Sequence, residues 1–212
     1  MTDLRQQLAS ARLYLCTDSR LGPGDFKTFV EAAYRGGVDV IQLRDKHIDA
    51  ATELAVLEVL AEQADRFDRL WAVNDRADIA ALAGAPIIHV GQDDLSARQT
   101  RQIVTGNTLL GRSSHSRIEA ESEAQDPKVD YFAVGPCWPT PTKPGRLAPG
   151  LSLVTEVAQM SVGKPWFAIG GIDQTNVDQV LAAGANRVVV VRAITEASDP
   201  ERAAAELRAK LP

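Results

Sequence analysis

The stretch Val38-Asp-Val-Ile-Gln-Leu-Arg-Asp-Lys46 begins as a short apolar run and ends in a cluster of charges. A helical pattern follows from Ala51 to Phe67, with apolar residues spaced three to four positions apart between acidic ones. A second apolar run, Leu70-Trp-Ala-Val73, comes next. This order of strand, polar loop and helix is one unit of a pattern that extends in both directions along the chain.

The pattern occurs eight times in all. The apolar runs begin at Arg12, Val38, Leu70, Pro86, Thr108, Val129, Pro165 and Asn186. Eight such units predict an α/β fold, a single (β/α)8 TIM barrel, with its chemistry on the loops that follow the strands. A chain of 212 residues is near the lower limit for this fold, so we expect one domain over residues 1–212.

Composition excludes several classes of protein. Hydrophobic residues make up 45% of the chain and charged residues 24%, as in ordinary globular domains. The net charge of −5 argues against a nucleic-acid partner, so any phosphate site must be local. Charges in Met1-Thr-Asp-Leu-Arg5 and the lack of a long apolar segment predict a cytoplasmic protein with no membrane partner. Cys16 and Cys137 have no disulfide or metal-site spacing.

Cations gather at one predicted strand end and in one long loop. Gln42, Arg44 and Lys46 alternate onto the same side of the second strand, at the barrel mouth. The proline-rich segment 135–150 has no helical or strand period and is either a lid or a spacer. It contributes two hydroxyls and a third cation, from Thr140, Thr142 and Lys143. A rim of solvated cations is the alternative interpretation.

Acidic and glycine-rich loop starts follow other strands. Asp75 and Asp94 come after neighbouring strands and can share one Mg²⁺, whose remaining ligands are commonly phosphate and water. Each can instead cap the helix that follows it. Gly170-Gly171, with Asp173 at a predicted helix start, and Val191-Arg192 follow the seventh and eighth strands. The loops after these strands commonly form a phosphate site, so the mouth predicts two phosphorylated substrates.

Six motifs in order resemble the thiamine phosphate synthase family over almost the whole chain. They are Gln42-Leu-Arg-Asp-Lys46, Asn74-Asp-Arg76, His89-Val-Gly-Gln-Asp-Asp94, Gly111-Arg-Ser-Ser-His115, Gly135-Pro136 with Pro139-Thr-Pro-Thr-Lys143, and Ala168-Ile-Gly-Gly-Ile172. The resemblance implies a transferase that joins a hydroxymethylpyrimidine diphosphate to a hydroxyethylthiazole phosphate and releases diphosphate. It also implies a homodimer.

The resemblance also implies residue roles. By this resemblance, the residues that contact the pyrimidine diphosphate are Gln42, Arg44, Lys46 and Asn74. The residues that bind Mg²⁺ are Asp75 and Asp94. The catalytic group comprises Lys143, Ser113, Arg44 and Lys46, with Ser113 near the leaving group. The groups that contact the thiazole phosphate are Thr140, Thr142, Gly171 and the backbone at Val191. Many family members have serine where this chain has Arg192, which we predict either grips the phosphate or forms an ion pair.

Two other functions fit the same barrel. A thiazole tautomerase shares much of the scaffold but needs no subsite for diphosphate and Mg²⁺. A catalytically silent binding module is possible on any fold, yet it has no reason to keep like charges facing each other without a metal. We interpret His89, within the fourth strand, as a packed or hydrogen-bonded residue rather than a base.

Overall fold

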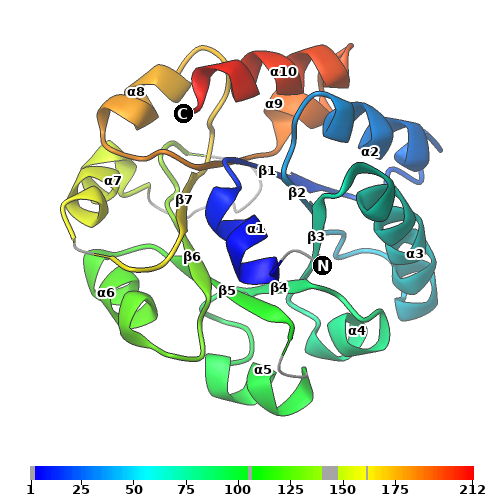
Figure 1. Cartoon of the computed structure of the whole chain (residues 1–212), viewed down its shortest axis with the longest axis horizontal. Helices are drawn as coiled ribbons and strands as arrows, with labels where there is room; N and C mark the ends of the chain where they lie inside the picture. The colour runs from blue at the N-terminus through cyan, green and yellow to red at the C-terminus, as the bar shows by residue number, and fades with distance from the viewer. Residues whose placement is uncertain (1–2, 105–106, 140–147, 161) are drawn as a thin grey trace.

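Eight parallel strands close into a barrel in the computed structural model, which describes residues 3–104, 107–139, 148–160 and 162–212. Each strand pairs with the next, and the last pairs with the first through Leu13 and Val188 (Figure 1). The strands are β1 Leu13–Thr17, β2 Val40–Leu43, β3 Leu70–Asn74, β4 Ile87–Val90, β5 Leu109–Ser114, β6 Tyr131–Val134, β7 Trp166–Ile169 and β8 Val188–Val190. The predicted (β/α)8 fold is confirmed.

Helices form a ring around the barrel (Figure 1). They are α2 Phe26–Arg35, α3 Ala50–Phe67, α4 Ala77–Leu82, α5 Ala97–Ile103, α6 Arg117–Gln125, α7 Gly150–Ala158, α8 Val177–Ala182 and α10 Pro200–Lys210. The short α9, Arg192–Thr195, follows β8, and α1, Leu4–Ser10, precedes β1. Within the described ranges, no helix is both long enough and apolar enough to cross a membrane.

Apolar side chains fill both faces of the sheet. One cluster lies between strands and helices, and a second fills the barrel interior with residues such as Tyr14, Tyr131 and Phe167. Leu8 of α1 packs into the interior cluster, and α1 lies across the barrel end in Figure 1. The amino-terminal end is thereby closed, which leaves the opposite end for a ligand.

The strand β5 is longer than its apolar run predicts. The run ends at Leu110, but the strand continues through Gly-Arg-Ser-Ser114. Two of these residues have defined polar partners: Arg112 binds polar groups between sheet and helices, and Ser113 bonds to His89 inside the barrel. A pattern of hydrophobicity along one strand cannot predict polar contacts with other strands, so it did not predict this extension of β5.

Gly111 provides the space for Tyr131 inside the barrel. A Cβ at Gly111 would lie 2.2 Å from Cζ of Tyr131. We expect Gly111→Ala to lower the free energy of unfolding by about 1–3 kcal/mol, because the ring must shift in a filled core. Denaturant unfolding measures this, with Gly163→Ala as control because its Cβ meets nothing within 4 Å. Equal losses in the two variants would contradict the steric explanation.

Candidate active site

A cavity of about 460 Å³ opens at the carboxyl ends of the strands. Many of the predicted site residues line it together: Gln42, Arg44, Asn74, Ser113, Gly171, Val191 and Arg192. Lys46, Asp75 and Asp94 lie beside it and are linked to it through Asn74. Thr140, Thr142 and Lys143 lie outside the described residues, so their predicted roles stay predictions.

The amides of Gln42 and Asn74 are held in defined orientations. Cys16 Sγ donates to Gln42 Oε1 over 3.0 Å, and Gln42 Nε2 donates to Asn74 Oδ1 over 3.1 Å. The thiol contact determines which end of the Gln42 amide faces Asn74. The two side chains are therefore preorganised for a polar ligand. Cys16 is not among the predicted site residues, although period-two alternation along β1 places it inward.

Asp75 is the centre of a charged cluster at the rim. Its Oδ2 lies 2.8 Å from Lys46 Nζ. Burial raises the pKa of the Asp75 carboxyl, but hydrogen bonds with Lys46, Asp94 and Asn74 outweigh burial and leave that pKa below its ordinary value. Asp75 also has a φ of +60°, a left-handed conformation that costs free energy in a residue with a side chain and is frequent at functional sites.

Neither carboxylate caps a helix, so the capping alternative is wrong. The N-cap residue of α4 is Arg76, and that of α5 is Ser96, which forms a capping box with Gln99. Asp94 Oδ2 instead accepts from the amide of Gly91 over 2.9 Å. The two carboxylates are thus free of the helix termini and interact with each other.

The donor set fits a partly solvated Mg²⁺. Within the described part of the chain, no group of three or more His, Cys, Asp or Glu can hold a metal. Two carboxylates alone are an incomplete shell, which is typical of Mg²⁺ bound together with phosphate oxygens and water. A permanent all-protein metal centre is not supported by these residues.

The lowered pKa of Asp75 predicts a difference in acid stability. A carboxyl whose pKa is depressed by folding stabilises the native state above its unfolded pKa, about 3.9, and loses this effect as pH falls through the folded pKa. We therefore expect the unfolding free energy of the wild type to fall more steeply below about pH 4 than that of Asp75→Asn. Urea unfolding at several pH values measures both curves. Parallel curves would show that Asp75 contributes nothing to the acid limb.

A chain of hydrogen bonds leads from the barrel interior to Ser113. The hydroxyls of Tyr14 and Tyr131 lie 3.1 Å apart, and that of Tyr131 lies 3.1 Å from His89 Nδ1. His89 Nε2 lies 3.0 Å from Ser113 Oγ. Burial raises the pKa of each of these two tyrosines well above the ordinary value for tyrosine, so their hydroxyls remain neutral. His89 is hydrogen-bonded as predicted, and the structure adds its contact with Ser113.

The opposite side of the cavity contains a glycine turn and a short helix. Gly170 and Gly171 have φ values of +105° and +69°, and a Cβ at Gly171 would lie 2.9 Å from Cβ of Trp138. The helix α9 begins at Arg192, directly after Val191. A glycine turn and a helix N-terminus both present backbone N–H groups to an anion. Arg192 lines the cavity, and the choice between a phosphate contact and an ion pair stays a prediction.

The predicted helix start at Asp173 is wrong. The helix α8 begins at Val177, after a turn. Asp173 Oδ1 accepts from the amide of Thr175, and Asn176 Oδ1 accepts from the amide of Asp173. These side-chain bonds compete with helix formation. The helix N-terminus nearest the predicted phosphate site is therefore that of α9. Sequence reasoning also missed Gln174 and Glu196, which line the cavity and carry no motif.

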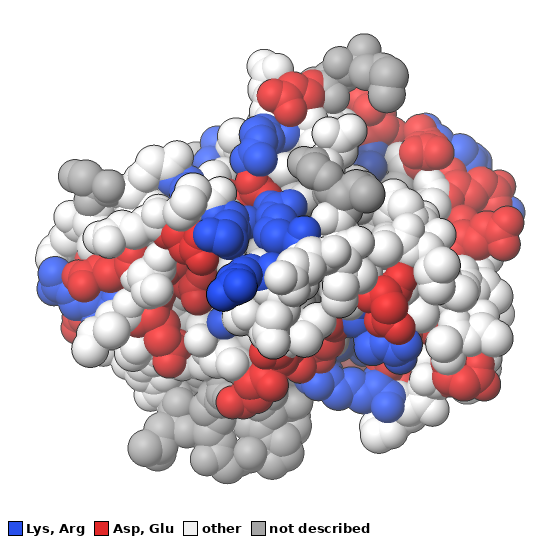
Figure 2. All heavy atoms as spheres, turned by 90° about the horizontal axis from the view of Figure 1, so that it is seen from below, with Lys and Arg blue, Asp and Glu red and all other residues white. Residues whose placement is uncertain are grey.

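Charges outside the site are mixed in sign. Figure 2 shows one face of the molecule, on which small groups of Lys and Arg alternate with Asp and Glu. Lys and Arg gather near the centre of this face, with Asp and Glu beside them. The absence of a nucleic-acid partner stays a prediction.

Fold and site together define a (β/α)8-barrel enzyme whose mouth combines a cationic and acidic rim with a backbone anion site. The family model described as thiamine monophosphate synthase matches residues 13–194. The chain belongs to this family and is a transferase of thiamine biosynthesis.

Curated relatives and solved structures agree with this assignment. The thiamine-phosphate synthase of Streptomyces avermitilis is 55% identical over 207 residues, covering 98% of this chain and 96% of the relative. That of Thermobifida fusca is 56% identical over 208 residues, covering 98% and 95%. The thiamine phosphate pyrophosphorylase structure from Pyrococcus furiosus superposes with a TM-score of 0.84 at 30% identity, covering 97% and 96%.

Proposed function

We propose that this enzyme joins 4-amino-2-methyl-5-hydroxymethylpyrimidine diphosphate to 4-methyl-5-hydroxyethylthiazole phosphate, giving thiamine phosphate and diphosphate. The observation that carries the proposal is one cavity with two different ends. Arg44 and Asn74 lie at one end, beside the Lys46–Asp75 pair. Gly171 and Arg192 lie at the other. The geometry suits two phosphorylated substrates that meet in the middle.

The cationic end favours departure of diphosphate. As the C–O bond to the pyrimidine methylene breaks, its electron pair leaves with the diphosphate, whose negative charge must be stabilised by groups already in place. Arg44 and Lys46 provide such charge, and Lys143 is predicted to add to it. Mg²⁺, when held by Asp75 and Asp94, supplies further electrostatic stabilisation of the phosphate oxygens.

The middle of the cavity needs no protein nucleophile. The amino group of the pyrimidine delocalises the positive charge on the methylene carbon, and the lone pair of the thiazole nitrogen forms the new C–N bond. Apolar side chains such as Ala133, Ile169 and Val189 line the cavity between its ends. They shield the cation from water, so the enzyme mainly orients and excludes solvent.

The thiazole tautomerase alternative is less well supported. A proton shift within one thiazole phosphate would use the Gly171 end of the cavity. It would leave unexplained the lowered pKa and the left-handed backbone of Asp75 at the other end. A silent binding module leaves the same features unexplained.

The proposal is tested by incubating the purified protein with both phosphorylated precursors and Mg²⁺. We expect thiamine phosphate and diphosphate to form in equal amounts, and neither to form when one precursor is omitted. Isomerised thiazole phosphate without any condensation would establish the tautomerase instead. Binding of either precursor without turnover would establish the silent module.

A cytoplasmic location and a homodimer complete the proposal. Cys16 and Cys137 are both buried thiols that form no disulfide, which suits a reducing compartment. Light scattering of the purified protein tests the dimer. A mass equal to one chain at micromolar concentration would reject it.

A further inference from the structure

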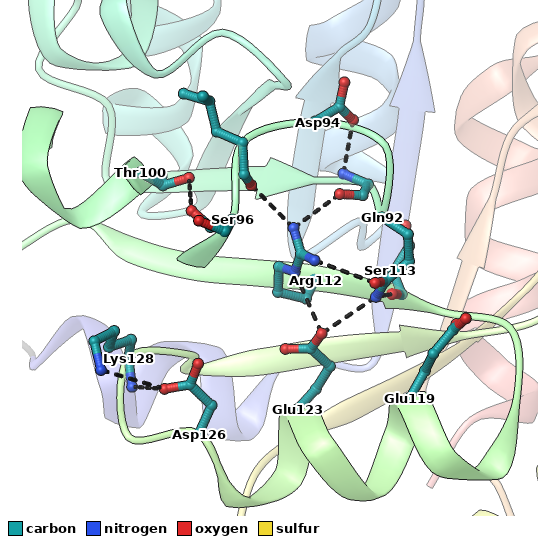
Figure 3. A network of polar contacts seen from close by, with 12 residues as sticks. Gln92, Asp94, Ser96, Thr100, Arg112, Ser113, Glu119, Glu123, Asp126 and Lys128 are labelled. Carbon is teal, nitrogen blue, oxygen red and sulfur yellow. Dashed lines mark hydrogen bonds and ion pairs between the residues drawn. The ribbon is translucent and has the colours of Figure 1, made fainter. Parts of the chain in front are cut away.

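A charged pair is buried between the barrel and its helices, where most of the packed side chains are apolar. Arg112 of β5 and Glu123 of α6 are each 7% exposed, and Arg112 Nε lies 3.3 Å from Glu123 Oε1 (Figure 3). Burying two charges is costly, and apolar residues of similar volume often stabilise a fold equally well. The contacts of the guanidinium indicate a role other than packing.

The guanidinium of Arg112 binds both ends of the turn that contains Asp94. Its Nη1 donates to the carbonyl of Gly91 over 2.8 Å and to that of Leu95 over 3.0 Å. Figure 3 shows the guanidinium between this turn and α6, with Asp94 at the outer edge of the turn. Within the turn, the amide of Asp94 donates to Gly91 O over a long 3.4 Å. We call the two hydrogen bonds from Arg112 to Gly91 and Leu95 the Arg112 clamp. They are shorter than the backbone hydrogen bond within the turn and are therefore better suited to fix the shape of the turn.

Gln92 connects the same clamp to the cavity. Its Oε1 accepts from Arg112 Nη2 over 3.3 Å. Its Nε2 donates to the carbonyl of Ser113, and to Glu123 Oε1 over 3.2 Å. The turn is consequently anchored to β5 at Ser113, whose side chain lines the cavity.

We propose that Arg112, with its charge balanced by Glu123, is a positioning residue that presents Asp94 to Asp75 and so sets the affinity for a divalent cation. The inference rests on the proposed function, which assigns the cation to these two carboxylates. Removing a residue that contacts a metal ligand, but not the metal itself, typically lowers the affinity of the site for the metal by about 10–100-fold. Arg112 acts through backbone carbonyls rather than through a metal-binding side chain.

The chain provides a matched control at the opposite end of the barrel. Arg101 of α5 donates to the carbonyls of Thr108 and Lys128 and pairs with Asp130, which is 7% exposed. This is the same chemistry, a guanidinium on two carbonyls and a buried carboxylate. The groups that Arg101 contacts lie just before β5 and β6, at the amino-terminal end of the barrel rather than at its mouth. Arg101→Met therefore tests loss of a clamp without disturbance of the Asp94 turn.

The experiment measures Mn²⁺ binding to the full chain by electron paramagnetic resonance, with and without inorganic diphosphate, together with the melting temperature. We expect Arg112→Met to weaken Mn²⁺ binding by about 10-fold or more and Arg112→Lys to weaken it less. Arg101→Met is expected to lower the melting temperature without changing the Mn²⁺ dissociation constant.

Asp94→Asn separates failure of the inference from failure of the proposed function. If Asp94→Asn weakens Mn²⁺ binding but Arg112→Met stays within twofold of the wild type, the inference is wrong and the metal site stands. If Asp94→Asn has no effect on Mn²⁺ binding, the metal assignment is wrong, and the inference that depends on it is wrong as well. Should Arg112→Met not fold, Arg112→Lys and Gln92→Leu decide the matter. Weakening by about threefold or more supports the inference, and wild-type affinity in both rejects it.

Discussion

Removing divalent cations with EDTA is expected to lower kcat by about three orders of magnitude or more, and added Mg²⁺ is expected to restore it. The reason is that Asp75 and Asp94 face each other at the rim with Lys46 as the cation paired to Asp75. A departing diphosphate brings several further negative charges to this place. Without a divalent ion, the carboxylates would oppose the charge that must develop in the transition state.

Asp94→Asn should raise the Mg²⁺ concentration for half-maximal turnover by about 10-fold or more, because one of two protein ligands is weakened. The control is Asp78→Asn on α4, which removes the same charge from an exposed ion pair with Arg76. Steady-state assays over a range of Mg²⁺ concentrations measure both variants. Turnover that survives EDTA in both the wild type and Asp94→Asn would contradict the metal assignment.

Arg44→Ala is expected to lower kcat by about 10²–10³-fold, the usual cost of losing one preorganised donor to a developing anion. Arg44 extends from the carboxyl end of β2, where its backbone amide donates to Thr17 O over 2.8 Å and holds it against β1. Its half-buried side chain lines the cavity. Partial burial strengthens its interaction with a phosphate relative to an exposed cation.

The pattern of kinetic changes distinguishes catalysis from general damage. KM for the thiazole phosphate should change little in Arg44→Ala, because that substrate is assigned to the opposite end of the cavity. Arg44→Lys should recover only part of kcat, since an ammonium lacks the two-pronged geometry of a guanidinium. Arg69→Ala is the control: it removes an arginine paired with Asp39 at the start of β3 and should leave kcat unchanged. Equal kinetic losses in Arg44→Ala and Arg69→Ala would reject the role of Arg44.

Sequence patterns predicted all eight strands of the barrel. Gly37, Gly84 and Gly184 follow helices with φ values of +94°, +64° and +101°, a left-handed conformation that favours glycine after a helix. The errors arose where polar side chains act locally. Asp173 and Asn176 form a turn that delays α8, and the polar end of β5 was not recognised as strand.

The arrangement of the strands as a barrel, and the polar side chains that follow each strand, could be predicted from the sequence alone, because both depend on local patterns of apolar and charged residues. Contacts between different units were decided only by the tertiary structure. The bond of Cys16 to Gln42, the proximity of Asp75 and Asp94, and the clamp of Arg112 on Gly91 and Leu95 each join separate β/α units. Such pairings depend on barrel closure and strand register, which bring together residues that share no local pattern.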